Sequence, residues 1–294
     1  MEIDSRVTGK TKLIGLIGNP VEHSISPQLH NSLSKFLGID LVYIPLKVEK
    51  NDLEIVVKSL KALDFVGFNV TIPYKRDIMK YIDENIKDAI LMGAVNTVKK
   101  LDGRLYGYNT DAEGFIRSYK EETGDGFKGK KVVLIGAGGV ARSIAVKIST
   151  EGVEKISLVN RSKEKAIELA DIVNENIREV VQVYSFDDKT FRMAFEESEI
   201  IINTTSLGMY PDITSTPVKN TDYFKSHQTV YDVVYNPRKT KFLSDAEDKG
   251  CRIVNGLGML FYQGINAYEI WTGYRFSEDN LKGIYESFKK IMDK

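Results

Sequence analysis

Short apolar runs alternate along the chain with longer segments in which apolar residues recur every three or four positions. The short runs predict buried strands, and the longer segments predict amphipathic helices. The expected elements of the first third are strands 13–18, 41–48, 66–72, 94–99 and 105–108, and helical segments 26–37, 52–63, 76–83 and 87–92. Strands that alternate with helices indicate a mainly parallel sheet. Asp102-Gly103 predicts an antiparallel hairpin, and therefore a mixed edge, between the last two strands.

A second alternating series begins at Lys130, after a predicted helix at 111–122 and a glycine-containing linker at 123–126. Its expected strands are 131–135, 155–159, 181–184, 200–203, 230–234 and 252–254, with helices that begin near Gly139, Ser162, Phe191 and Thr240, and terminal helices at 259–272 and 278–292. Six strands with short crossovers match a doubly wound, Rossmann-type domain. The predicted fold class is therefore α/β with two domains. A mixed α/β domain covers 1–110 and is completed by C-terminal helices 259–294 that pack back at the hinge, and a dinucleotide-binding domain covers 111–258.

The strand 131–135 runs directly into a glycine turn, Gly136-Ala137-Gly138-Gly139, and Val140 then opens a segment of helical length. A dinucleotide pyrophosphate requires this order of strand, glycines and helix. The glycines let the backbone approach the phosphates, and the helix start presents free N–H groups to them. Glycine turns after strands are also common for purely structural reasons, so both interpretations stay open on this motif alone.

The end of the next strand favours NADP over NAD. NAD sites usually place an Asp or Glu there, about twenty residues after the glycines, to bind the ribose 2′-hydroxyl. This chain has Asn160-Arg161-Ser162 instead, with Lys165 one turn further on. The Arg161 guanidinium can bind a 2′-phosphate through two hydrogen bonds, Ser162 can donate another, and Lys165 adds positive charge. The alternative is a solvated basic helix start, which the helix dipole disfavours.

Two further loops at the carboxyl ends of strands belong to the predicted cofactor site, because ligands of such sheets bind at that edge. One loop follows strand 200–203 and includes Thr204 and Ser206, and the other contains Gly256. Val233, near the end of strand 230–234, is assigned to the same site.

Composition narrows the expected partner to a small molecule. Basic and acidic residues each number 41, which argues against a nucleic acid or a membrane surface as partner. Cys251 is the only cysteine and there are three histidines, so neither a disulfide framework nor a metal site is expected. The first residues lack the apolar core of a signal peptide, and no apolar run approaches the length of a membrane span. The expectation is a cytoplasmic protein that is a monomer or a homodimer.

Polar residues stand near the strand ends of the first domain, where a packed core would not favour them. They are Ser24, Ser26, Asn69, Thr71, Lys75, Asn96 and Asp111. Hydroxyls and amides suit a small, hydroxyl-rich molecule that carries a carboxylate, and a Lys/Asp pair offers acid–base chemistry. Structural alternatives stay open: Ser26 and Asp111 can be helix caps, and Lys75 can be a solvated loop lysine.

Taken together, these motifs resemble those of the shikimate dehydrogenase family, in the same order and from about Leu13 to the C-terminal helices. The motifs are Gly18-Asn19-Pro20 with His23-Ser24-Ile25-Ser26-Pro27, Asn69-Val70-Thr71-Ile72-Pro73-Tyr74-Lys75, Gly93-Ala94-Val95-Asn96-Thr97, Asn109-Thr110-Asp111, the glycine turn, Asn160-Arg161-Ser162, Tyr231-Asp232-Val233-Val234-Tyr235, and Gly256-Leu257-Gly258-Met259-Leu260 with Gln263. The resemblance implies reversible, NADP-linked reduction of 3-dehydroshikimate to shikimate in aromatic biosynthesis.

The resemblance also assigns roles by position. Lys75 and Asp111 form the catalytic pair: Lys75 exchanges the proton on the substrate oxygen at C3, and Asp111 positions both Lys75 and the neighbouring hydroxyl. The substrate carboxylate is expected to be bound by Ser24 and Ser26 together with Tyr235. The substrate hydroxyls are expected to be bound by Asn69, Thr71, Asn96, Asp111 and Gln263. No metal is implied, because the lysine itself polarises the ketone.

Two alternatives stay open: a quinate/shikimate dehydrogenase that uses NAD or NADP, and a relative that binds the metabolite or nucleotide without catalysis. Family members that prefer NADP often carry Arg where this chain has Lys165, and lysine lacks the planar fork of arginine. The segments 107–111 and 234–241 also resemble the branch that accepts quinate as well as shikimate, often with NAD. A relative that senses the metabolite or nucleotide without turnover would be expected to lose Lys75 or Asp111, and both are present.

Overall fold

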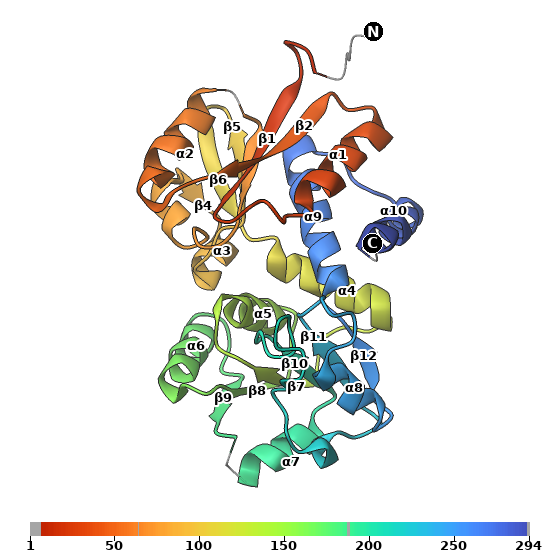
Figure 1. Cartoon of the computed structure of the whole chain (residues 1–294). Coiled ribbons are helices and arrows are strands. Elements are labelled where there is room, and N and C mark those ends of the chain that lie inside the picture. The colour runs from red at the N-terminus through yellow and green to blue at the C-terminus, as the bar shows by residue number, and fades with distance from the viewer. Residues whose placement is uncertain (1–6, 64, 187–188, 293–294) are drawn as a thin grey trace. The chain divides into compact units, whose positions relative to one another are not determined.

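The computed structural model describes residues 7–63, 65–186 and 189–292 (Figure 1). The chain divides into two compact units. Unit 1 comprises Met1–Thr110 and Gln263–Lys294, and unit 2 comprises Asp111–Tyr262. The second boundary falls inside helix α9 (Leu257–Thr272), so this helix contributes residues to both units.

Unit 1 is built on a six-stranded mixed sheet with the order β2-β1-β3-β5-β6-β4. Its strands β1 and β2 pair in parallel, as do β1 and β3, whereas β5 is antiparallel to both β3 and β6. The mixed edge and the hairpin predicted from Asp102-Gly103 are therefore confirmed. The strands are β1 (Lys12–Gly18), β2 (Leu41–Lys47), β3 (Gly67–Val70), β4 (Glu84–Asn85), β5 (Thr97–Leu101) and β6 (Arg104–Tyr108).

Side-chain alternation along these strands gives the sheet of unit 1 two buried faces. Phe68 and Val70 point to one face, where they share a core with Leu53, Val57 and Leu60 of helix α2 (Leu53–Ala62). The opposite face lies under helix α1 (Ser26–Leu37) and the unit 1 part of α9, as Figure 1 shows. Buried Tyr43 and Asn69 lie there, with the aromatic rings of His30 and Trp271 packed against Tyr43.

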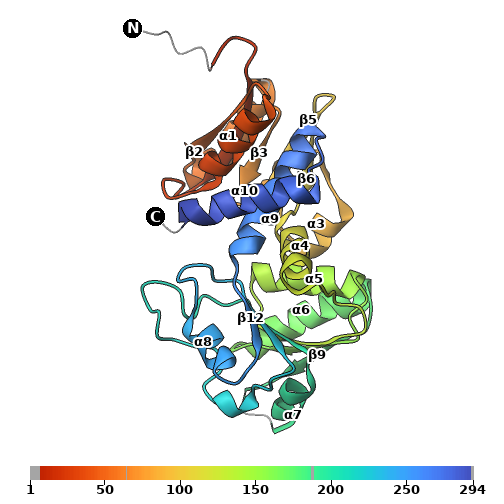
Figure 2. The same ribbon diagram turned by 90° about the vertical axis from the view of Figure 1, so that its right-hand side faces the viewer.

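The remaining helices described for unit 1 are α3 (Lys87–Met92) and α10 (Glu278–Met292), which are labelled in Figure 2. Two short 3₁₀ turns, η1 (Lys50–Asp52) and η2 (Asp77–Tyr81), also belong to this unit. Three predicted elements of unit 1 differ from the structure, and one strand was missed. The predicted strand 94–99 is β5, which begins only at Thr97, after Asn96. The predicted strand 66–72 ends at Val70, because Thr71–Tyr74 form a turn in which the Tyr74 N–H donates to the Thr71 carbonyl oxygen. The segment 76–83 is helical only as the 3₁₀ turn η2, and the two-residue strand β4 beside β6 was not predicted.

Unit 2 is a parallel six-stranded sheet with the order β12-β11-β10-β7-β8-β9. This is the doubly wound arrangement, in which the direction of strand addition reverses between the first and fourth strands, here β7 and β10. Its strands are β7 (Lys131–Ile135), β8 (Lys155–Val159), β9 (Val181–Tyr184), β10 (Ile200–Asn203), β11 (Thr229–Asp232) and β12 (Arg252–Val254). Its helices are α4 (Asp111–Thr123), α5 (Gly139–Thr150), α6 (Lys163–Asn176), α7 (Lys189–Glu197), η3 (Thr221–Tyr223) and α8 (Lys241–Glu247). The Rossmann-type prediction is confirmed.

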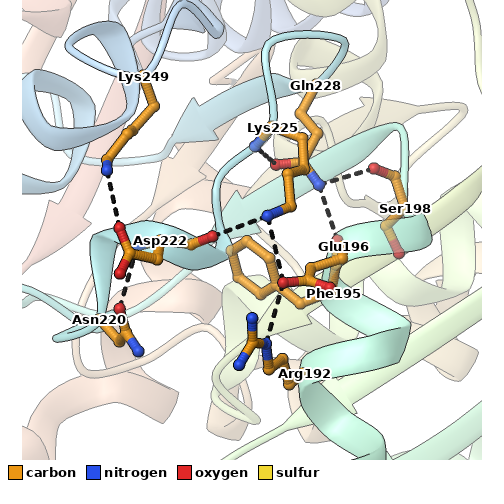
Figure 3. A network of polar contacts seen from close by, with 9 residues as sticks. All are labelled: Arg192, Phe195, Glu196, Ser198, Asn220, Asp222, Lys225, Gln228 and Lys249. Atoms are coloured by element: carbon orange, nitrogen blue, oxygen red, sulfur yellow. Dashed lines mark hydrogen bonds and ion pairs between the residues drawn. The ribbon is translucent and has the colours of Figure 1, made fainter.

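A polar network stabilises the edge of unit 2 where β10 and β11 begin (Figure 3). The buried Gln228 amide, just before β11, donates to the carbonyl oxygens of Phe195 (2.7 Å) and Ser198 (3.0 Å). Lys225 forms an ion pair with Glu196 (3.2 Å). This network secures the amino ends of the strands, so it lies away from the carboxyl edge at which ligands of such sheets bind.

Among the helices of the described residues, none combines the length and the apolar character that crossing a bilayer requires.

Candidate functional site

The glycine turn of unit 2 lies at the carboxyl end of β7, beside the switch between β7 and β10. Gly136 has φ +110°, and a Cβ at this position would lie 2.5 Å from Thr204 Oγ1, so only glycine fits. The Gly136 N–H donates to the Val159 carbonyl oxygen (2.9 Å), and the Thr204 N–H and hydroxyl both donate to the Ile135 carbonyl oxygen (2.9 and 2.6 Å). The turn is thus held between the ends of β8 and β10.

The start of helix α5 has the open surroundings that a phosphate group needs. Its N-cap is Gly138, and no side chain caps the helix or places an acidic group in its first turn. A Cβ at Gly138 or Gly139 would meet no atom within 4 Å. The start of α5 therefore has no side chain at Gly138 or Gly139 and no acidic group in its first turn, which suits the binding of a pyrophosphate by the N-terminal N–H groups of the helix.

The Asn160-Arg161-Ser162 segment follows β8, the neighbour of β7. Arg161 is exposed, and Ser162 caps helix α6 by accepting from the Lys165 N–H at 3.5 Å. The Asn160 side chain donates to the Ser162 carbonyl oxygen (2.8 Å), which shapes the turn. The Ser162 hydroxyl donates to the Glu164 carboxylate (2.8 Å), so it must turn away from Glu164 before it can donate to a phosphate.

Asp232, at the end of β11, was not singled out from the sequence as a site residue. Its carboxylate is fully buried and accepts hydrogen bonds from Asn203, Val234 and Thr240. Burial raises the pKa of Asp232 to about 6, and these hydrogen bonds act in the opposite direction. The signal available in the sequence was an acidic residue inside the predicted strand 230–234, directly after Val230 and Tyr231, where a buried charge is costly.

The substrate residues predicted for unit 1 centre on the Asn69 amide in β3. Asn69 Oδ1 accepts from the Tyr43 hydroxyl at 2.8 Å, and Asn69 Nδ2 donates to the Asn96 carbonyl oxygen (2.9 Å) and to Thr97 Oγ1 (3.0 Å). Both amide hydrogens are therefore used internally, and only the second lone pair of Oδ1 is left for a ligand. The role of Tyr43 in orienting Asn69 was not predicted from the sequence, because Tyr43 lies among the apolar residues of β2.

Asn96 is anchored by a second set of buried hydrogen bonds. Its Nδ2 donates to Thr110 Oγ1 (3.1 Å), and its Oδ1 accepts from the Thr110 N–H (2.8 Å) and from Thr97 Oγ1 (3.0 Å). Since Asn69 in turn holds the Asn96 carbonyl oxygen, the ends of β3, β5 and β6 form one connected polar cluster. Such a cluster fixes the orientation of its amides.

Ser24 and Ser26 precede and begin helix α1. Ser24 Oγ accepts from the Ser26 N–H (3.3 Å), and both serines are half-buried. The alternative in which Ser26 caps α1 is wrong: the N-cap position is Ile25, Pro27 occupies the first turn, and no side chain caps the helix. Burial raises the pKa of the Tyr43 phenol, and the Ser26 side chain acts on this pKa in the opposite direction.

The other predicted substrate and catalytic residues are divided between the units. Thr71 and Lys75 flank the turn after β3 and are half-buried, and the Lys75 carbonyl oxygen accepts from the Val95 N–H at 2.8 Å. Gln263, also half-buried, belongs to unit 1 as well. Asp111 is the first residue of unit 2 and of helix α4, and exposed Tyr235 follows β11 in the same unit.

Gly256 and Val233, both predicted at the cofactor site, lie against each other in unit 2. A Cβ on Gly256 would overlap the Val233 carbonyl oxygen, so the two loops touch backbone to backbone. Ser206 is exposed on the loop after β10. The predicted cofactor residues of unit 2 therefore come from the carboxyl ends of β7, β8, β10, β11 and β12.

Family comparisons cover most of the chain. Residues 16–98 match the model for the shikimate dehydrogenase substrate binding domain, and residues 119–240 match the shikimate / quinate 5-dehydrogenase model. Residues 256–275 match the shikimate 5′-dehydrogenase C-terminal domain.

Individual relatives agree with these models. A curated shikimate dehydrogenase (NADP(+)) of Alkaliphilus oremlandii is 42% identical over 94% of this chain and 96% of its own length. The crystal structure of shikimate 5-dehydrogenase from Listeria monocytogenes, in complex with shikimate and NAD, has a TM-score of 0.91 and 40% identity, covering 96% of this chain and 99% of that one. Quinate dehydrogenase from Corynebacterium glutamicum, in complex with NAD, has a TM-score of 0.85 and 29% identity, covering 95% and 99%. The resemblance inferred from the motifs is thereby confirmed, and the chain belongs to the shikimate dehydrogenase family.

Proposed function

We propose that this protein is an NADP-dependent shikimate dehydrogenase, an oxidoreductase that interconverts shikimate and 3-dehydroshikimate. The observation that carries the proposal is the pairing of an open glycine turn with Arg161 on the neighbouring strand end, in a chain 42% identical to a curated NADP-dependent member. NADPH, when bound, supplies the hydride for the substrate ketone.

The chain's own residues supply the remaining chemistry. Lys75 holds the proton that the C3 oxygen gains on reduction, and Asp111 stabilises the charged form of that lysine. Ser24, Ser26 and Tyr235 hold the substrate carboxylate, while Asn69, Thr71, Asn96 and Gln263 hold its hydroxyls. The connected amide cluster in unit 1 supports this assignment, because fixed amides discriminate well between hydroxylated substrates.

The cofactor lies over the glycine turn and the start of α5 in this proposal. Gly136, Ala137, Gly138, Gly139 and Val140 receive the pyrophosphate, and Asn160, Arg161, Ser162 and Lys165 receive the adenosine ribose with its 2′-phosphate. Thr204, Ser206, Val233 and Gly256 line the rest of the site. The open Cβ positions at Gly138 and Gly139 and the exposed Arg161 support this placement.

A dual-specificity quinate/shikimate dehydrogenase is the second candidate. It is favoured by the match to a model that covers both activities and by the fold shared with a quinate dehydrogenase. The engagement of the Ser162 hydroxyl with Glu164 also leaves NADP selectivity dependent mainly on Arg161 and Lys165.

Steady-state kinetics with four substrate pairs test the proposal. Shikimate and quinate are each oxidised with NADP and with NAD, and the reduced nicotinamide is followed by its absorbance. The highest kcat/KM is expected for shikimate with NADP. Comparable values for quinate would establish the second candidate, and the absence of turnover with all four pairs would refute both.

The cytoplasmic location and the monomeric or dimeric state remain predictions.

A further inference from the structure

The carboxylate of Asp232 joins three separate segments of unit 2. Oδ1 accepts from Asn203 Nδ2 (3.0 Å) at the end of β10 and from the Val234 N–H (3.0 Å) in the loop after β11. Oδ2 accepts from the Thr240 hydroxyl at 2.6 Å, at the start of helix α8. All three donors are neutral, and the carboxylate is completely buried.

Asn203 carries the constraint further into the loop after β10. With its Nδ2 held by Asp232, Asn203 Oδ1 faces this loop and accepts from the Thr205 N–H (3.0 Å) and the Thr205 hydroxyl (2.7 Å). Thr205 Oγ1 then accepts from the Leu207 N–H at 3.3 Å. A chain of hydrogen bonds therefore runs from Asp232 through the segment that contains Thr204 and Ser206.

Thr240 connects the carboxylate to the same loop from the other side. Its Oγ1 caps α8 by accepting from the Leu243 N–H (3.3 Å) while it donates to Asp232. Gly208, at the far end of the loop after β10, packs on Thr240, where a Cβ would approach the threonine Cβ to 3.2 Å. The loops after β10 and β11 are thus tied to each other through one acidic group.

Burial of a carboxylate among neutral donors costs desolvation free energy on folding, so a contribution to stability alone does not explain this residue. Three hydrogens converge on its two oxygens, and an ionised carboxylate is a side chain that accepts without donating. An asparagine would keep the two bonds to Oδ1 but would present an NH₂ group to the Thr240 hydroxyl. The arrangement therefore maintains loop geometry at the carboxyl edge of the sheet, where ligands bind.

We propose that Asp232 is a positioning residue for the cofactor: it sets the conformation of the loops after β10 and β11, which carry Thr204, Ser206 and Val233. This inference rests on the placement of NADP proposed above. Asp232 itself touches no reacting group, and it acts through Asn203 and Thr240.

Two variants remove the same hydrogen bond in different ways. Thr240→Val removes the bond to Oδ2 together with the cap of α8, and Asp232→Asn removes the ionised acceptor but leaves the cap. An effect that the two variants share is therefore attributed to the loss of the hydrogen bond between Thr240 and Asp232. Thr240→Ser keeps the hydroxyl and serves as the conservative variant.

The matched control is Gln228→Leu. Gln228 is also buried in unit 2 and holds two carbonyl oxygens, but at the amino ends of the strands. The Gln228→Leu variant should have a lower melting temperature and an unchanged affinity for NADPH. Comparison with this control separates a loss of stability from a loss of loop position.

The full-length variants are titrated with NADPH alone by fluorescence and then assayed with shikimate and NADP. Asp232→Asn and Thr240→Val are expected to raise the Kd for NADPH and the KM for NADP about five- to tenfold, which is less than the full value of one hydrogen bond to a charged group because Asp232 acts on the cofactor only through the loops. Saturating kcat should change less than about threefold, and Thr240→Ser should restore the affinity. Wild-type affinity for NADPH in both variants, whatever the melting temperature, would overturn the inference. Because NADPH binding is measured without substrate, this result does not depend on whether shikimate is turned over.

Discussion

The Tyr43 hydroxyl donates a 2.8 Å hydrogen bond to Asn69 Oδ1, and both side chains are buried in unit 1. Because the Asn69 amide hydrogens go to Asn96 and Thr97, this bond completes the fixation of the amide. The Tyr43 ring itself is held by His30, which stacks on it with ring centroids 4.4 Å apart. The aromatic core under α1 therefore determines how one predicted substrate residue is presented.

Replacing Tyr43 with Phe tests this relationship. The ring and its packing stay, but Asn69 Oδ1 loses its donor, and the amide gains freedom to rotate. The KM for shikimate should rise about five- to tenfold, with the Kd for NADPH unchanged. The matched control is Tyr268→Phe, which removes a buried hydroxyl of the same aromatic cluster that pairs with Ser34 at 3.2 Å. Equal effects of the two variants on KM would contradict a specific role for Tyr43.

Lys75→Ala should lower kcat by roughly 10²- to 10⁴-fold, because the proton on the C3 oxygen loses its donor and acceptor. Binding of NADPH, measured by fluorescence, should stay near the wild-type value. Lys80→Ala is the control, since Lys80 is a more exposed lysine of the same segment, paired with Asp77 at 3.5 Å. Turnover close to wild type in Lys75→Ala would remove Lys75 from the mechanism.

Arg161→Ala should weaken NADPH binding by about ten- to a hundredfold, while NADH binding changes little. The reason is that a 2′-phosphate gains charge-assisted hydrogen bonds from the guanidinium and a 2′-hydroxyl does not. Lys163→Ala, at an exposed neighbouring position in the first turn of α6, provides the comparison. If Arg161→Ala weakened both nucleotides equally, Arg161 would not recognise the 2′-phosphate.

His30 predicts how stability depends on pH. Burial lowers the pKa of His30 from 6.5 to about 3 in the folded protein. Between these values the unfolded chain binds a proton that the folded chain does not, so the free energy of unfolding falls as the pH drops below 6.5. At pH 5 the loss from this residue is about 2 kcal/mol.

Urea unfolding of the wild type and of His30→Phe between pH 7.5 and 5 measures this loss. The variant keeps an aromatic ring beside Tyr43. Its free energy of unfolding should lack the decrease below pH 6.5 that is attributed to His30. His227→Phe, at an exposed histidine, should retain the wild-type profile. Parallel profiles for the wild type and His30→Phe would show that His30 already titrates normally in the folded state.

Much of the fold follows from local sequence. The central strands of unit 2 could be located within a few residues because a parallel strand that is buried on both faces is a nearly continuous apolar run. Gly136 could be recognised because a tight turn between a strand and a helix needs a residue that tolerates positive φ. Arg161 could be recognised because its distance along the chain from the glycine turn is set by one helix and one strand.

The tertiary structure decided what each polar side chain does once the chain is folded. Local pattern predicted Ser26 as a helix cap, but the folded chain places Ile25 at the N-cap position and leaves the helix without a side-chain cap. Local pattern also could not show that Asp232 binds Asn203, because that bond exists only when β10 and β11 are paired in register. The sequence by itself determined the strands, the helices and the residue types at their ends, because these depend on local periodicity and backbone preference. Only the tertiary structure decided which hydrogen-bonding groups are satisfied internally, because that depends on partners brought together from distant parts of the chain.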